Sequence, residues 1–139
     1  MRIRVENLTK RFGSFAAVDN VSFEVEDGSL VALLGPSGSG KSTLLRILAG
    51  LESSDSGSVW FDDEAATDLH ARVRGVGFVF QHYALFRHLT VAQNIGFGLR
   101  IRKVEKKKCG EVIDRVLDLI GLQDQRDEFP SQLSGGQQQ

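Results

Sequence analysis

A glycine-rich segment in the first third of the sequence has the composition and spacing of a phosphate-binding loop. Residues 35–42 read GPSGSGKS, which fits the pattern G-x-x-x-x-G-K-[ST]. Glycines let successive backbone N–H groups turn inward around phosphate oxygens, and a following helix directs its positive N-terminus at the same anion. The segment therefore predicts a site for a nucleoside triphosphate without saying which one. The alternative is a glycine-rich turn with no ligand.

The side chains of this loop have separate expected roles. Lys41 can reach the β- and γ-phosphates as a point charge, and we expect it to be catalytic. Ser42 offers a hydroxyl group to Mg²⁺. The residues expected to bind the nucleotide here are Gly35, Pro36, Ser37, Gly38, Ser39, Gly40, Lys41, Ser42 and Thr43.

A second glycine motif lies at the end of the sequence, where residues 132–139 read QLSGGQQQ. Ser134 and Gln137 stand three residues apart, which is the spacing of a helix capping box. Gly135 and Gly136 would expose the amides at this helix start, which predicts a second anion site. The alternative is an ordinary cap before a glutamine-rich helix. Two such sites suggest a triphosphate held between them, within one chain or across a dimer.

The elements that must position the first loop are strands and one helix. Alternation of apolar and polar residues predicts a half-buried strand at 21–25, and continuous apolar runs predict strands covered on both faces. A helix is expected over 42–49, closed by Gly50. The strands expected in this part of the chain are residues 21–25, 30–34, 59–61 and 76–81.

The later part of the sequence has a helical period. Thr90 with Gln93 matches a capping box, and apolar residues at helical spacing over 112–120 predict a helix that stops at Gly121. The basic residues of 102–108 are interpreted as a solvated helix face. Cys109 and Trp60 are interpreted as structural residues, and the three histidines lack the mutual spacing of metal ligands.

Composition excludes several classes of protein. The chain has 139 residues, of which 41% are hydrophobic and 25% charged, and its formal net charge is -1. This charge balance does not support a global nucleic-acid footprint. No apolar run approaches the ~18 residues that a spanning helix needs, and the N-terminus has no apolar signal-peptide core. The single cysteine excludes an internal disulfide.

The glycine motifs carry a family resemblance. The stretch LSGGQ at residues 133–137 resembles the signature motif of ATP-binding cassette (ABC) ATPases, and Gln81 resembles the glutamine of their Q-loop. The resemblance covers the chain from Leu8 to Gln139. It implies an α/β fold, a P-loop NTPase core with an antiparallel β-subdomain and a helical subdomain. On this basis the chain is an incomplete ABC nucleotide-binding domain, with 1–86 running through the Q-loop and 87–139 ending at the signature motif.

The resemblance also implies roles for individual residues. Phe12 resembles the aromatic residue that stacks on adenine, although a core residue beneath the β-subdomain is the alternative. Gln81 resembles the residue that contacts Mg²⁺ and the attacking water, so it is expected to be catalytic and, with Ser42, to bind the metal. The γ-phosphate of a second subunit's ATP is expected to contact Ser134, Gly135, Gly136 and Gln137.

Two segments point to a subfamily. Residues 69–72 and 76–91 resemble ATP-binding subunits of sulfate/thiosulfate importers. The implied protein hydrolyses ATP and forms a head-to-tail homodimer. It contacts membrane-spanning permease subunits through the segment after Gln81. A solute-binding protein is an indirect partner, and no nucleic-acid partner is expected. The implied location is the cytoplasmic face of the cell membrane, or the stromal face of a plastid envelope if the protein is plastid-encoded.

Three alternatives remain open at this point. The first is an importer of the same architecture for polyamine, iron or sugar. The second is a soluble ABC ATPase of repair or translation without a membrane partner. The third is a non-catalytic truncated remnant.

The sequence departs from the family after the signature motif. The family continues into a helix, a buried strand that ends in Asp-Glu, and a switch histidine, none of which follow here. The aspartate would hold Mg²⁺ and the glutamate would polarise the attacking water. We therefore expect an incomplete copy of a longer protein, or a truncated product. On its own this 139-residue chain is expected to be inactive as an ATPase and marginally folded.

Overall fold

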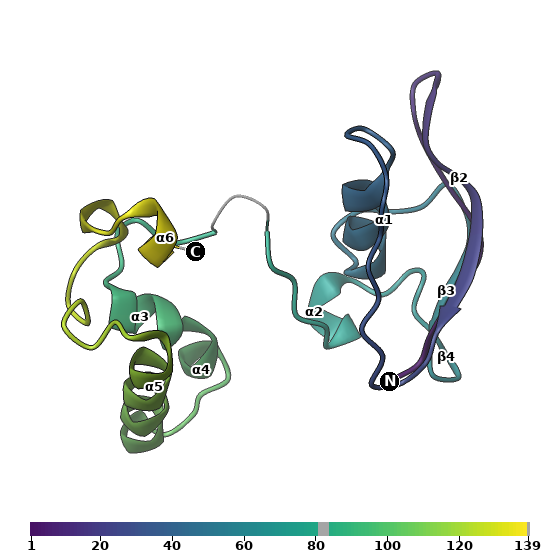
Figure 1. The fold of residues 1–139 in the computed structure, drawn as a ribbon. Helices are drawn as coiled ribbons and strands as arrows, with labels where there is room; N and C mark the ends of the chain where they lie inside the picture. Colours follow the sequence, from purple (N-terminus) through teal and green to yellow (C-terminus); the bar gives the residue numbers. More distant parts are fainter. Residues whose placement is uncertain (81–83, 139) are drawn as a thin grey trace. The chain divides into compact units, whose positions relative to one another are not determined.

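The computed structural model describes residues 1–80 and 84–138, in two compact units, Met1–Phe78 and Val79–Gln139 (Figure 1). The first unit contains β1 Ile3–Phe12, β2 Phe15–Val25, α1 Lys41–Leu48, β3 Ser56–Phe61, β4 Glu64–Ala65 and α2 Ala71–Arg74. The second contains α3 Val91–Ile95, α4 Phe97–Ile101, α5 Lys106–Ile120, the short 3-10 helix η1 Pro130–Gln132 and α6 Gly135–Gln138. The predicted subdomain boundary between residues 86 and 87 is placed from sequence motifs, whereas the two units are defined by their compactness. The boundary therefore stays a prediction.

The first unit is built on a four-stranded antiparallel sheet with the order β2-β1-β3-β4. Val5 of the central strand β1 pairs with Phe23 of β2 on one side and with Val59 of β3 on the other. The expected strands at 21–25 and 59–61 are therefore confirmed. Both are parts of longer strands, and the hairpin from β3 to β4 was not predicted.

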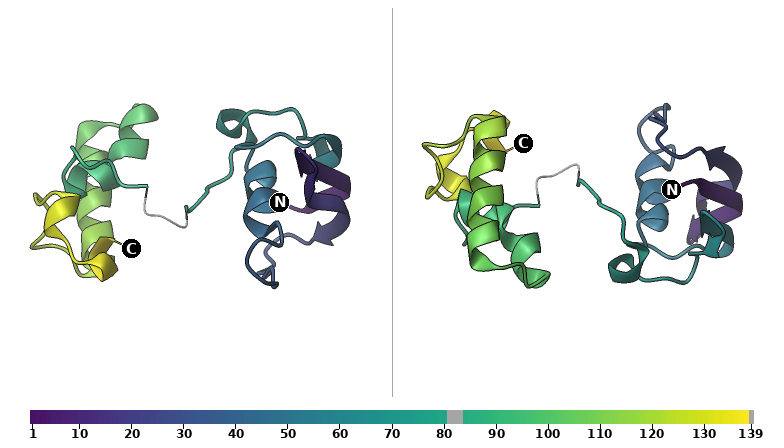
Figure 2. Two further views of the ribbon diagram at one scale, coloured as in Figure 1. Left: turned by 90° about the horizontal axis from the view of Figure 1, so that it is seen from above. Right: turned by 90° about the horizontal axis from the view of Figure 1, so that it is seen from below.

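Helix α1 covers one face of this sheet, as the views in Figures 1 and 2 agree. Leu44 and Ile47 of α1 lie in one apolar cluster with residues of the sheet. The largest side chains that are fully buried there are Leu8, Ile47, Val5 and Val59. Burying apolar surface of this kind is the main force that holds the helix on the sheet. The helix expected over 42–49 is confirmed.

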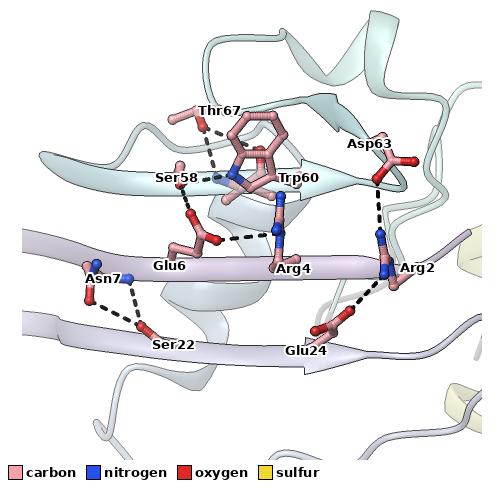
Figure 3. Close-up of polar contacts among 11 residues, drawn as sticks. Arg2, Arg4, Glu6, Asn7, Ser22, Glu24, Ser58, Trp60, Asp63 and Thr67 are labelled. Carbon is pink, nitrogen blue, oxygen red and sulfur yellow. Dashed lines mark hydrogen bonds and ion pairs between the residues drawn. The ribbon is translucent and has the colours of Figure 1, made fainter.

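The opposite face of the sheet is polar (Figure 3). Arg2 forms ion pairs with Glu24 at 3.3 Å and with Asp63 at 3.1 Å. The guanidinium of Arg4 lies over the ring of Trp60, 5.1 Å from its centroid. The indole N–H of Trp60 also donates to the Ser58 hydroxyl at 3.0 Å. Trp60 thus packs across the strands, as its structural interpretation predicted.

Two predicted strands are wrong. Residues 30–34 and 76–80 adopt no strand, and the side chains of Leu30, Leu34 and Val79 are exposed. A β-strand needs a hydrogen-bonding neighbour, and among the described residues neither segment is part of the sheet. Leu33 and Val76 still pack against the apolar cluster, so each segment keeps one contact with the core.

The second unit is helical, as predicted. Helix α5 ends at Gly121, which has the left-handed conformation with φ 67°, and the capping box of Thr90 and Gln93 begins α3. The apolar core of the second unit consists of Val91, Leu117, Leu122 and Leu133. Cys109 is buried on α5 and its thiol donates to the Val104 carbonyl, consistent with a structural residue. In residues 1–80 and 84–138, the helices are all too short or too polar to cross a membrane.

Candidate nucleotide-binding site

The glycine-rich loop lies directly before α1 and is exposed along residues 35–39. Gly35 has φ 153°, and a Cβ added there would lie 2.9 Å from the Ser39 hydroxyl and 4.0 Å from the Lys41 ammonium. An added methyl group would therefore project into the inside of the loop. The glycine keeps this concave side open for a ligand that approaches the backbone closely.

Gly40 fixes the loop on the sheet. It has φ 86°, and an added Cβ would lie only 1.8 Å from the carbonyl oxygen of Ala17 and 3.8 Å from Val18. Strand β2 therefore runs against the start of α1 with no room for a side chain. The carbonyl of Gly40 accepts the first helical hydrogen bond, from the Leu44 N–H at 2.8 Å. The loop is thus held between a strand and a helix.

Lys41 turns its ammonium group back over the loop. Its Nζ donates to the carbonyl oxygens of Gly35 at 2.8 Å and Pro36 at 2.6 Å, and to the Ser39 hydroxyl at 3.1 Å. These contacts place a positive charge at the concave side of the loop. Helix α1 has no acidic residue in its first turn, so its positive end is not neutralised by its own side chains. The arrangement suits a polyanion such as a triphosphate.

The hydroxyl groups of Ser42 and Thr43 lie in the first turn of α1. Ser42 is exposed there and Thr43 is half-buried. Mg²⁺ is usually bound by one or two protein oxygens together with substrate phosphates, rather than by a cage of side chains. An exposed hydroxyl beside a phosphate cradle fits this chemistry.

Phe12 lies at the end of β1, where the hairpin to β2 turns. The hairpin tip and the loop before α1 are at the same end of the first unit (Figure 1). Phe12 is 51% exposed, so it is not the core residue of the alternative interpretation. An exposed aromatic ring at this end can accept a stacked base.

The signature segment belongs to the second unit. The Ser134 N–H donates to the Gln137 side-chain carbonyl at 2.9 Å, and the Gln137 N–H donates to the Ser134 hydroxyl at 3.4 Å. This is the predicted capping box, and it begins the single turn of α6. Gly135 and Gly136 are exposed, and an added Cβ would meet nothing within 4 Å at either. Their open backbone is compatible with either an anion contact or an ordinary cap.

The structure thus places Phe12 and residues 35–43 in the first unit and Ser134–Gln137 in the second. Gln81, predicted to be catalytic and to bind metal, lies outside the described residues.

Sequence reasoning missed a charged cluster beside Phe12. Lys10 is a buried lysine on β1, and its Nζ lies 3.0 Å from Glu52 and 3.5 Å from Asp55. The hydrogen bond between Lys10 and Glu52 is the main cause that raises the pKa of Lys10 and lowers the pKa of Glu52. The available signal was position: Lys10 follows the inward Leu8 by two residues in a strand, which places a charge on the buried face.

The family profile described as ABC transporter matches residues 18–139. The chain is 54% identical over its whole length to the probable sulfate/thiosulfate import ATP-binding protein of Chlorella vulgaris, of which it covers 59%. It is 57% identical to the sulfate/thiosulfate import ATP-binding protein of Bordetella bronchiseptica, of which it covers 40%. The chain therefore spans about two-fifths to three-fifths of these relatives.

Solved structures of ATP-binding cassettes have the same fold. A dimeric cassette in a post-hydrolysis state with ADP and phosphate matches with a TM-score of 0.82 at 31% identity. The match covers 98% of this chain and 65% of that one. A cassette of an ABC transporter matches with a TM-score of 0.81 at 30% identity, covering 98% and 60% of the two chains. The predicted fold, a partial nucleotide-binding domain of this kind, is confirmed.

Proposed function

The chain belongs to the ABC transporter family, and from this membership we propose that it is the ATP-binding part of an importer subunit that energises uptake of sulfate or thiosulfate. The observation that carries the proposal is the cradle of residues 35–40, with the Lys41 ammonium held at its concave side. The solute is inferred from the relatives, which are named as sulfate/thiosulfate import proteins and are 54–57% identical to the chain.

Nucleotide binding is assigned to the first unit. Backbone N–H groups of residues 37–40 and the N-terminus of α1 bind the phosphates. The Lys41 ammonium leaves the loop carbonyls and binds the β- and γ-phosphates instead. Ser42 would hold Mg²⁺, which neutralises charge that develops on the phosphates during hydrolysis. Phe12 stacks on the adenine. Its exposure at the same end of the unit as the loop supports this role.

The signature segment is assigned to the second ATP of a dimer. We infer that Ser134, Gly135, Gly136 and Gln137 approach the γ-phosphate bound by a partner copy in head-to-tail arrangement. The dimeric cassette with ADP and phosphate, 31% identical to this chain, supports a dimer of such domains. The exposed glycines of α6 support a backbone that can approach an anion closely.

Contact with the membrane-spanning partner is assigned to Gln81 and the segment after it. In the described part of that segment, Asn94 fixes the chain by hydrogen bonds. Its side-chain amide donates to the carbonyls of Phe86 and Leu89 at 3.2 and 3.0 Å, and its oxygen accepts from the Phe86 N–H at 2.9 Å. A loop fixed in this way presents a defined surface to a partner. The subunit is proposed to sit peripherally at the membrane face where ATP is available.

Sulfate uptake in a deletion strain tests the proposed function. The full-length protein that carries this sequence should restore uptake of labelled sulfate or thiosulfate, whereas its Lys41→Ala variant should not. Lys107→Ala, which removes an exposed lysine near the start of α5, is the matched control and should behave as wild type. Restored uptake of a polyamine, iron or sugar instead of sulfate would assign a different solute, and no restored uptake would contradict an importer.

A further inference from the structure

The charged cluster around Lys10 is an unusual feature of the sheet. Lysine is almost never fully buried unless its ammonium group has a partner. Only 8% of Lys10 is exposed. Its Nζ lies 3.0 Å from Glu52 and 3.5 Å from Asp55. Two carboxylates thus fix the position of one ammonium group, which on a surface lysine would be free to move.

One of these two residues, Asp55, is itself tied to β1. The Asp55 N–H donates to the Thr9 carbonyl at 2.9 Å, and the Asp55 carboxylate accepts from the Arg11 N–H at 2.6 Å. The segment from Glu52 to Asp55 therefore closes around the end of β1. The ammonium group of Lys10 is thus held by two residues of the segment that leads into β3.

This ammonium group contacts the aromatic ring of Phe12. The Lys10 Nζ lies over the ring, 5.3 Å from its centroid, which is within the range of a cation–π interaction. Phe12 is nevertheless 51% exposed. One face of Phe12 is thus occupied by a fixed cation while half of the side chain remains open to a ligand.

The cluster is also joined to the phosphate cradle. Lys10 pairs in register with Val18 of β2, and Val18 and its neighbour Ala17 lie against Gly40. The strand pair that carries Lys10 and Phe12 therefore abuts the start of α1. A ring held in place at Phe12 has a defined position relative to the phosphate loop.

We propose that Lys10, held by Glu52 and Asp55, is a positioning residue that fixes the Phe12 ring and polarises it, so that its open face receives the nucleotide base. This inference rests on the proposed function, in which Phe12 stacks on adenine. A cation on one face draws electron density from the ring, which favours stacking of an electron-rich purine on the other. A held ring also loses less conformational freedom when the base binds.

The test separates base binding from phosphate binding. In the full-length protein, Lys10→Met with Glu52→Gln removes the charge pair with side chains of similar shape. The remaining carboxylate, Asp55, is about half exposed and keeps its hydrogen bond from the Arg11 N–H. The dissociation constant is measured for ATP and for inorganic tripolyphosphate, which has no base. Phe12→Ala is measured in parallel, and Lys10→Arg, which keeps the cation, is the conservative variant.

We expect the double variant to bind ATP about three- to ten-fold more weakly and to bind tripolyphosphate as wild type does. Phe12→Ala should weaken ATP binding by about five-fold or more, again without an effect on tripolyphosphate. Lys10→Arg should stay within about two-fold of wild type for ATP.

Three results would overturn the inference. If Phe12→Ala weakens ATP binding but the double variant does not, Lys10 is only structural and the proposed function stands. If the double variant weakens ATP and tripolyphosphate equally, the cluster acts on the fold rather than on the ring. If wild type binds tripolyphosphate and ATP equally and Phe12→Ala changes neither, no base stacks on Phe12, and the proposed adenine contact is wrong as well.

Discussion

The guanidinium group of Arg74 donates a hydrogen bond of 2.6 Å to the backbone carbonyl of Ile47. Ile47 lies in the last turn of α1, the helix whose first turn carries the phosphate-binding residues. The same guanidinium also donates to the carbonyls of Leu48 at 2.9 Å, Thr67 at 2.7 Å and Leu69 at 2.7 Å. A positive charge at the C-terminal end of a helix is favourable, and here it also joins that end to the chain that leads into α2.

Replacement of Arg74 should destabilise the first unit. Arg74 is 7% exposed, and Arg74→Met would remove its hydrogen bonds to the carbonyls of Leu48, Thr67 and Leu69. Among the described residues, the Ile47 carbonyl would keep only the Gly50 N–H as a donor. The expected loss is about 2–4 kcal/mol in the free energy of unfolding, measured by denaturant unfolding of the full-length protein. Arg72→Met on the same short helix removes an exposed arginine and should cost less than about 0.5 kcal/mol. Equal effects of the two changes would show that the buried hydrogen bonds do not stabilise the fold.

Gly40 should be far more sensitive to a methyl group than another glycine of similar conformation. Gly40→Ala places a Cβ 1.8 Å from the Ala17 carbonyl oxygen, so β2 and the loop must separate. Gly28 has φ 72° and would meet nothing within 4 Å, so Gly28→Ala carries the backbone strain without the clash. We expect a loss of about 1 kcal/mol for Gly28→Ala and several-fold more for Gly40→Ala in thermal or denaturant unfolding. Similar losses for both would mean that the close approach of Gly40 to Ala17 is not maintained in solution.

The pair Lys10 and Glu52 predicts a pH dependence of stability. The pKa of Glu52 is lowered from its ordinary 4.5, so its contribution is present above pH 4.5 and is lost as the pH falls through the lower folded value. The pKa of Lys10 is raised from its ordinary 10.5, so its contribution is present below pH 10.5 and is lost as the pH rises through the higher folded value.

The measurement compares wild type with the variant that combines Lys10→Met and Glu52→Gln. The difference in their free energies of unfolding should stay constant from about pH 5 to pH 10, because both groups keep their charges over this range. This difference in free energy of unfolding should change as the pH falls below 4.5, the ordinary pKa of Glu52. A difference that varies strongly around pH 7 would contradict the assigned pair.

Asn94 should matter more for coupling than for hydrolysis. Asn94→Ala removes the hydrogen bonds that fix residues 86–90, the segment proposed to meet the membrane-spanning partner. We expect ATP hydrolysis of the full-length protein within about three-fold of wild type, and a larger fall in solute transported per ATP. Gln123→Ala, at an exposed position of the same unit, is the control and should change neither quantity. An unchanged transport ratio in Asn94→Ala would remove this segment from the partner contact.

Local patterns were sufficient to predict much of the fold. The phosphate loop and α1 follow from glycine spacing and an apolar helix face, and the end of α5 follows from Gly121. Both capping boxes, at Thr90 and Ser134, were also predicted, because a cap is formed by residues three positions apart. Such features depend only on residues that are close together in the sequence, so they can be predicted from it.

The two wrong strands and the missed contacts of buried cations involve partners that are distant along the chain. The apolar runs at 30–34 and 76–80 have the composition of buried strands, but composition does not provide the neighbour that a strand needs. The contacts of Lys10 with Glu52 and of Arg74 with Ile47 join residues of separate elements. No local pattern predicts which carboxylate or carbonyl a buried cation will reach.

The most direct test of the account is the rate of ATP hydrolysis by the full-length protein with Lys41→Ala. Lys41 places the ammonium group at the concave side of the phosphate loop, and a charge-assisted contact of this kind contributes about 1.5–3 kcal/mol even before the transition state is considered. Phosphate release with Mg-ATP should therefore fall at least ten-fold and be essentially abolished, while Lys107→Ala hydrolyses ATP as wild type does. Hydrolysis by Lys41→Ala within two-fold of wild type would contradict the assignment of this loop as the ATP site.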